Sequence, residues 1–159
     1  MEEKELKETI LEYVETHNSM SLATEGDGLP HAATLFYVNI GFQLYFVSSP
    51  LSRHGENIAR NASVSATISE DYSGWSDIKG IQMEGRVEKV GSIMENGRIV
   101  KAYVKKFPDV ADFFLSPRKL GQAIANKVAK VRFYKFVPTR IRFINNALDF
   151  GHRDELILS

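Results

Sequence analysis

Short segments in which apolar and polar residues alternate, joined by tight turns, dominate the first 90 residues of this sequence. Val64, Ala66 and Ile68 alternate with serine and threonine, which is the pattern of a strand with one buried face. The turn sequences at residues 25–28 and 39–41 are short enough to connect antiparallel neighbours as hairpins. Parallel neighbours would need much longer crossover connections. The sequence therefore predicts an antiparallel barrel in preference to a doubly wound parallel sheet.

Helical spacing of apolar residues predicts a helix over residues 3–17 and several short helices between residues 91 and 126. Ser52 is placed to cap another short helix, which ends near Asn61. The tail, residues 145–159, shows no strong periodicity. The strands are expected at residues 21–24, 30–40, 42–48, 64–68, 80–90, 131–137 and 141–144. Residues 1–159 are thus predicted to form one mainly β domain of the α+β class, with peripheral helices.

Composition argues against several classes of function. Lysine plus arginine equals aspartate plus glutamate at 20 each, whereas a general nucleic-acid binder needs a surplus of cations. The absence of cysteine excludes disulfides and iron–sulfur clusters, and the scattered histidines lack the spacing of metal ligands. The acidic N-terminus does not resemble a signal peptide, and no apolar run approaches the length of a membrane span. We expect a cytoplasmic protein that binds neither nucleic acid nor membrane.

The segment between Ser48 and His54 carries the most informative polar side chains. It lies between a predicted strand and a predicted helix, and the first turn of a helix offers unpaired N–H groups to an anion. Ser52 adds a hydroxyl, Arg53 a guanidinium whose geometry suits a phosphate, and His54 a further donor. A terminal phosphate could be held here. In the alternative interpretation, Ser52 only caps the helix, and Arg53 and His54 face solvent.

The order of these segments resembles the FMN-binding split barrel of the pyridoxamine 5'-phosphate oxidase superfamily. After the first helix come Ser21-Leu22-Ala23-Thr24, a glycine turn, Pro30-His31-Ala32-Ala33, a hairpin ending in Leu44-Tyr45-Phe46-Val47-Ser48, then Ser52-Arg53-His54 and finally Gly80-Ile81-Gln82-Met83-Glu84-Gly85. The resemblance covers residues 5–90 best. It implies a six- to seven-stranded antiparallel split β-barrel. It also implies a homodimer with FMN at the subunit interface.

The resemblance also implies a set of cofactor-binding residues. In the oxidases a Ser-Arg-Lys stretch holds the FMN phosphate; Ser52 and Arg53 match it, and His54 takes the place of the lysine. Ser48 corresponds to a threonine of the oxidases, and His31 stands where they have an arginine.

Other flavin contacts of the oxidases are replaced in this sequence. Phe36 stands where the oxidases have a lysine. Lys79-Gly80 stands where they have Arg-Gln, although Gln82 lies two residues on and could reach a flavin edge. The basic C-terminal motif that grips the oxidases' own substrate is not found. The oxidation of pyridoxamine phosphate itself is therefore not expected.

Several functions remain open for this predicted barrel. The first is an FMN-dependent oxidoreductase that acts on an unknown small molecule, with the cofactor supplying the redox chemistry. The second keeps the fold but changes the ligand to haem or the deazaflavin F420; for haem, His31, His54 and His152 are the candidate axial ligands. The third is a dimer that binds flavin without catalysis.

Overall fold

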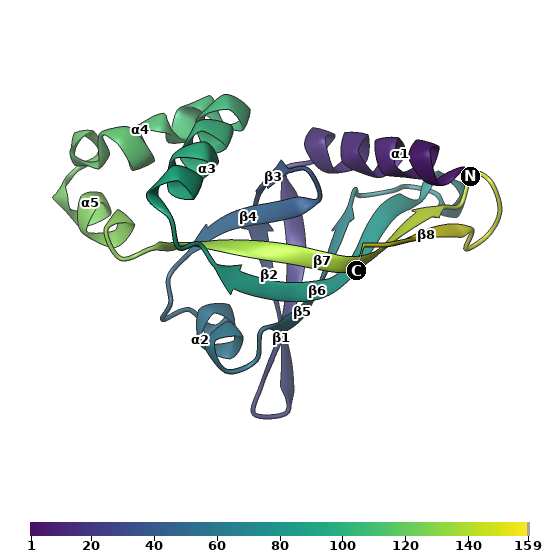
Figure 1. The fold of residues 1–159 in the computed structure, drawn as a ribbon, viewed down its shortest axis with the longest axis horizontal. Coiled ribbons are helices and arrows are strands. Elements are labelled where there is room, and N and C mark those ends of the chain that lie inside the picture. The colour runs from purple at the N-terminus through teal and green to yellow at the C-terminus, as the bar shows by residue number, and fades with distance from the viewer. Residues whose placement is uncertain (159) are drawn as a thin grey trace.

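The computed structural model describes residues 1–158, a mixed α+β structure built around one strongly curled antiparallel sheet (Figure 1). In this part of the chain the strands are β1 (Ser19–Gly26), β2 (Leu29–Phe36), β3 (Val38–Ile40), β4 (Gln43–Ser48), β5 (Ser63–Ser69), β6 (Lys79–Lys89), β7 (Arg132–Asn145) and β8 (Arg153–Ile157). The helices are α1 (Glu3–Thr16), α2 (Arg53–Arg60), α3 (Ile93–Lys106), α4 (Ala111–Leu115) and α5 (Gln122–Val128). Short 3-10 turns lie at η1 (Trp75–Asp77), η2 (Pro108–Val110) and η3 (Pro117–Leu120).

The sheet curls so far that its two edge strands are neighbours along the chain. The strand order is β2-β1-β5-β6-β7-β4-β3, with β8 added to β7, and every pairing is antiparallel. The edge strands β2 and β3 are separated only by Tyr37. Tyr37 is fully buried, and its hydroxyl donates to the carbonyl of Val14 in α1 at 2.6 Å. The antiparallel split-barrel prediction is confirmed, although the single strand expected at residues 30–40 is interrupted at Tyr37.

The interior of the barrel is filled by the side chains that alternate inward along the strands. Leu22, Phe46, Ile68, Ile81, Phe136 and Ile141 are all less than 2 % exposed. Burying an aliphatic or aromatic side chain of this size contributes about 1.5–3 kcal/mol. Helices α1 and α2 add apolar residues to the same core, and they lie on opposite sides of the barrel (Figure 1).

Strand β7 corrects the expectation that Pro138 divides the C-terminal strands. Residues 132–145 form one strand, and Pro138 lies opposite Gly85 where the register of β6 and β7 shifts. A β-bulge tolerates proline because the missing N–H is not needed in the ladder there. Gly85 is required at the same place, since an added Cβ would lie 2.2 Å from the carbonyl oxygen of Val137.

Strand β8 corrects a second expectation, that residues 141–144 form the last strand of the chain. Residues 153–157 pair with β7 from Arg140 to Ile144. Leu156 is buried in the barrel core, whereas Ile157 is 54 % exposed. So short a segment shows little periodicity of its own, and its conformation depends on the strand that it joins.

The segment between β6 and β7 is helical, as predicted, and extends to one side of the barrel (Figure 1). Only α4 and α5 are the short helices expected, because α3 has 14 residues. Helix α3 packs on β3 and β4 through a second cluster of buried residues, made of Val38, Tyr45, Ile99 and Tyr103. Helices α4 and α5 follow this anchor. Within residues 1–158, no helix is long and apolar enough to cross a membrane.

Candidate functional site

The beginning of α2 forms a tightly built corner at the end of β4. Ser52 caps the helix: its Oγ accepts the N–H of Gly55 at 3.1 Å and donates to the carbonyl of Ser49 at 2.7 Å. The predicted cap at Ser52 is therefore confirmed. Gly55 faces this loop so closely that an added Cβ would lie 2.5 Å from the carbonyl oxygen of Ser49. The chain from Ser49 to Ser52 thus wraps against the first turn of α2.

The corner presents hydrogen-bond donors that the described residues leave unused. Within residues 1–158, the backbone N–H groups of Arg53 and His54 have no hydrogen-bond partner. In the same part of the chain, the exposed side chain of Arg53 makes neither a hydrogen bond nor an ion pair. The N-terminal end of a helix carries a partial positive charge. These donors therefore have the chemistry of an anion site.

Two histidines and a serine complete the corner. His54 is only 9 % exposed, and its Nε2 lies 2.5 Å from the Oγ of Ser48. The ring of His31, on β2, is nearly parallel to that of His54, with the centroids 6.5 Å apart. Burial lowers the pKa of His54 below its ordinary value, and the neighbouring His31 lowers it further. The His54 imidazole is therefore neutral at pH 7 and acts as a hydrogen-bonding group.

The structure places two of the predicted residues elsewhere. Lys79 begins β6 at the end of the barrel nearest α1, where its carbonyl accepts the hydroxyl of Tyr13 at 3.0 Å. Gln82 is exposed on the outer surface of β6, between Thr67 and Arg142. One chain thus brings together five of the seven predicted residues: His31, Ser48, Ser52, Arg53 and His54.

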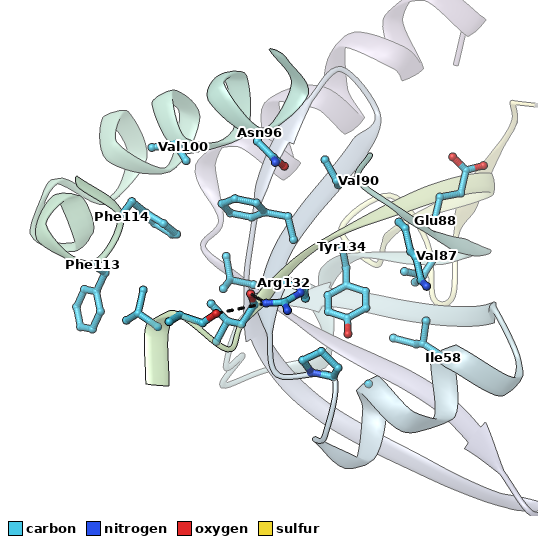
Figure 2. A pocket seen from close by; sticks show the side chains of 18 of the residues that line it. Ile58, Val87, Glu88, Val90, Asn96, Val100, Phe113, Phe114, Arg132 and Tyr134 are labelled. Atoms are coloured by element: carbon cyan, nitrogen blue, oxygen red, sulfur yellow. Dashed lines mark hydrogen bonds between the residues drawn. The ribbon is translucent and has the colours of Figure 1, made fainter. Parts of the chain in front are cut away.

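A cavity of about 770 Å³ lies beside this corner, and the residues that form it were not singled out in the sequence (Figure 2). It lies between α2, the ends of β4, β6 and β7, and the helical segment that carries α3, α4 and α5. Most of its lining is apolar, as with Ile58, Phe114 and Tyr134. These side chains come from segments far apart in the chain, so no local sequence pattern identifies them as the lining of one cavity.

Comparison with known proteins finds relatives along most of the chain. The family model described as Pyridoxamine 5'-phosphate oxidase matches residues 6–145. The "UPF0306 protein" of Klebsiella pneumoniae strain 342 is 29% identical over 125 residues, which cover 76% of this chain and 72% of the relative. General stress protein 26 of Bacillus subtilis strain 168 is 23% identical over 112 residues, which cover 70% of this chain and 79% of the relative.

Solved structures share the fold at lower identity. General Stress Protein 26 from Bacillus anthracis aligns with a TM-score of 0.66 at 18% identity, covering 96% of this chain and 98% of that one. A heme binding protein from Mycobacterium smegmatis aligns with a TM-score of 0.69 at 16% identity, and the alignment covers 91% of this chain and 57% of that one. A FAD-binding protein from Mesorhizobium loti aligns with a TM-score of 0.61 at 18% identity, and the alignment covers 82% of this chain and 88% of that one. With its antiparallel split barrel and a family match spanning residues 6–145, the chain belongs to the pyridoxamine 5'-phosphate oxidase family.

Proposed function

We propose that this protein binds FMN and holds the phosphate at the beginning of α2. One observation carries the proposal: within residues 1–158 the backbone N–H groups of Arg53 and His54 are unpaired, and they lie in the first turn of α2 with the exposed Arg53 side chain, next to the hydroxyls of Ser48 and Ser52. This is the point at which family resemblance predicts the phosphate. A phosphate dianion accepts several hydrogen bonds, and a guanidinium can supply two of them in parallel.

The surface of β2 supports a second part of the proposal, a homodimer with flavin between the subunits. Every residue of β2 is at least partly exposed in a single chain, and Phe36 is 67 % exposed. β2 is also an edge strand of the sheet, and an exposed edge strand offers unpaired backbone groups that another chain can cover. His31 lies on the same strand, and its ring stacks on that of His54 in the phosphate corner.

The activity that follows from this proposal is oxidoreduction of a small molecule. Bound flavin supplies hydride or electron transfer, while the protein binds it, orients it and excludes water. Oxidation of pyridoxamine phosphate is not proposed, because the basic C-terminal motif of the oxidases is not found. The absence of cysteine suits a reducing compartment such as the cytoplasm.

Titration with FMN, followed by quenching of flavin fluorescence, tests the phosphate corner. Arg53→Ala should weaken FMN binding by about one to two orders of magnitude, because a charge-assisted hydrogen bond contributes about 1.5–3 kcal/mol. Arg60→Ala is the matched control, since it removes the same charge from the other end of α2. Among residues 1–158, the Arg60 guanidinium pairs only with the exposed Asp27 carboxylate, at 3.3 Å, so its loss should leave affinity unchanged. Full affinity in Arg53→Ala would remove the corner from the site.

The absorption spectrum of the purified protein tests the identity of the cofactor. A flavin band, with one FMN released per chain on denaturation, is the expected result. A Soret band without flavin would contradict the proposal and point to haem, as in the relative described as a heme binding protein. Bleaching of the flavin by NAD(P)H without oxygen would then support an enzyme, whereas an unchanged spectrum would indicate a passive flavin binder.

A further inference from the structure

The cavity between the barrel and the helical segment is partly open to solvent and has a volume of about 770 Å³. Pockets that bind small molecules have volumes of about 300–1,000 Å³ and are lined mainly by apolar side chains. The cavity matches both properties.

The helices that cover the cavity, α4 and α5, do not pack tightly against the barrel. Neither α4 nor α5 contributes a fully buried residue. Phe114 ties α4 to the rest of the structure: its ring lies 5.7 Å from that of Phe133 and 5.5 Å from that of Tyr103. Phe113 stays 37 % exposed at the cavity, and Val128 also lines it (Figure 2). The apolar side of this segment therefore faces open space that a ligand can fill.

The charges at the cavity favour an anion. Two cations and one carboxylate line it: Lys89, Arg132 and Glu88. The carboxylate of Glu88 is already paired, with Arg86 at 2.7 Å and Lys135 at 3.6 Å. Because the Glu88 carboxylate is already neutralised, the charge that Lys89 and Arg132 leave at the cavity is positive.

Arg132 is the cation best placed to bind that anion. Its Nη1 donates to the carbonyl of Val131 at 2.9 Å and to that of Ala129 at 3.4 Å, which orients the guanidinium at the edge of the cavity (Figure 2). Within the described residues, Nε and Nη2 have no partner. These donors can form a bidentate pair with a carboxylate.

We propose that this cavity binds a small amphipathic carboxylate. The apolar body of the ligand lies among Ile58, Phe114 and Tyr134, and its acid group pairs with Arg132. This site adjoins the flavin corner, since Pro50 and Gly55 line the cavity, but it does not use the donors of that corner, because Ser52 and Arg53 do not line it. The inference does not depend on whether flavin binds.

Calorimetric titration of the full chain with octanoate and with octan-1-ol tests the proposal. The two probes share an apolar chain, and only octanoate carries a charge. Wild type should bind octanoate saturably at one site per chain. Arg132→Met should weaken octanoate binding about tenfold or more, since a charge-assisted pair is lost, and leave the affinity for octan-1-ol within about twofold. Arg118→Met is the matched control, because Arg118 is exposed on η3 and does not line the cavity.

A variant that fills the cavity provides the second arm. Ala125→Trp places a large ring in the space from α5, and it should abolish binding of both probes while the circular dichroism spectrum stays that of the wild type. Arg53→Ala should keep full octanoate affinity, because it lies outside the cavity. The proposal is overturned if wild type shows no saturable octanoate binding, if folded Ala125→Trp still binds, or if Arg132→Met weakens both probes equally. Loss of octanoate binding in Arg53→Ala would overturn the separation of the two sites.

Discussion

Replacing Gly55 by alanine tests the packing that builds the phosphate corner. In an exposed helix, Gly→Ala normally stabilises a protein by about 0.5–1 kcal/mol. At Gly55 the new Cβ would lie 2.5 Å from the carbonyl oxygen of Ser49 and 2.9 Å from the Oγ of Ser52. The carbonyl belongs to the backbone and cannot rotate away, so the loop must shift, and overpacking of this kind costs about 1–3 kcal/mol. Subtracting the gain from the penalty leaves a net loss of roughly 1 kcal/mol in the free energy of unfolding, within a range of about 0–2.5 kcal/mol.

Gly97→Ala in α3 is the matched control for this prediction. An added Cβ at Gly97 has no neighbour within 4 Å, so only the helix propensity changes and stability should rise by about 0.5–1 kcal/mol. Urea unfolding followed by circular dichroism gives both values, provided the slope m is unchanged and the protein concentration is the same. A Gly55→Ala variant that is as stable as Gly97→Ala would refute the close packing of residues 49–52 on α2.

Two further variants probe the contacts of α3 with the barrel. The hydroxyl of Tyr103 donates to the carbonyls of Tyr45 at 3.0 Å and Phe36 at 3.2 Å, so Tyr103→Phe should lower the free energy of unfolding by about 1–3 kcal/mol. A loss below about 0.5 kcal/mol in urea unfolding would contradict that role. Burial lowers the pKa of Lys106 to about 8, while the Glu15 carboxylate acts in the opposite direction. The folded protein then releases this proton at lower pH than the unfolded chain, so stability should rise between about pH 8 and 10 in wild type relative to Lys106→Met. If the free energies of unfolding of the two proteins change with pH in parallel, the lowered pKa of Lys106 is refuted.

Features that depend on neighbouring residues could be predicted from the sequence alone. The spacing of Leu6, Ile10 and Val14 predicts α1, because side chains three and four positions apart share one face of a helix. Ser52 reads as a cap because the N–H groups that it serves lie within the next three residues.

The same local interpretation failed where a distant strand sets the conformation. Pro138 predicts a break in the strand, yet the register shift beside its partner Gly85 accommodates a proline within β7. Residues 153–157 show little pattern and become a strand only because β7 offers an unpaired edge. The positions of Lys79 and Gln82 relative to the phosphate corner follow from strand order, which the sequence does not state.

By itself, the amino-acid sequence determined the antiparallel class of this fold, the helix cap and the group of donors that follow it, since each is encoded in residues a few positions apart. Only the tertiary structure decided that His31 and His54 stack, and that Arg132 meets an apolar cavity roofed by α4 and α5. The physical reason is the range of the interactions: local hydrogen bonding and periodicity act along the chain. Contacts across the barrel depend instead on which strands pair and in what register, and that is a property of the whole fold.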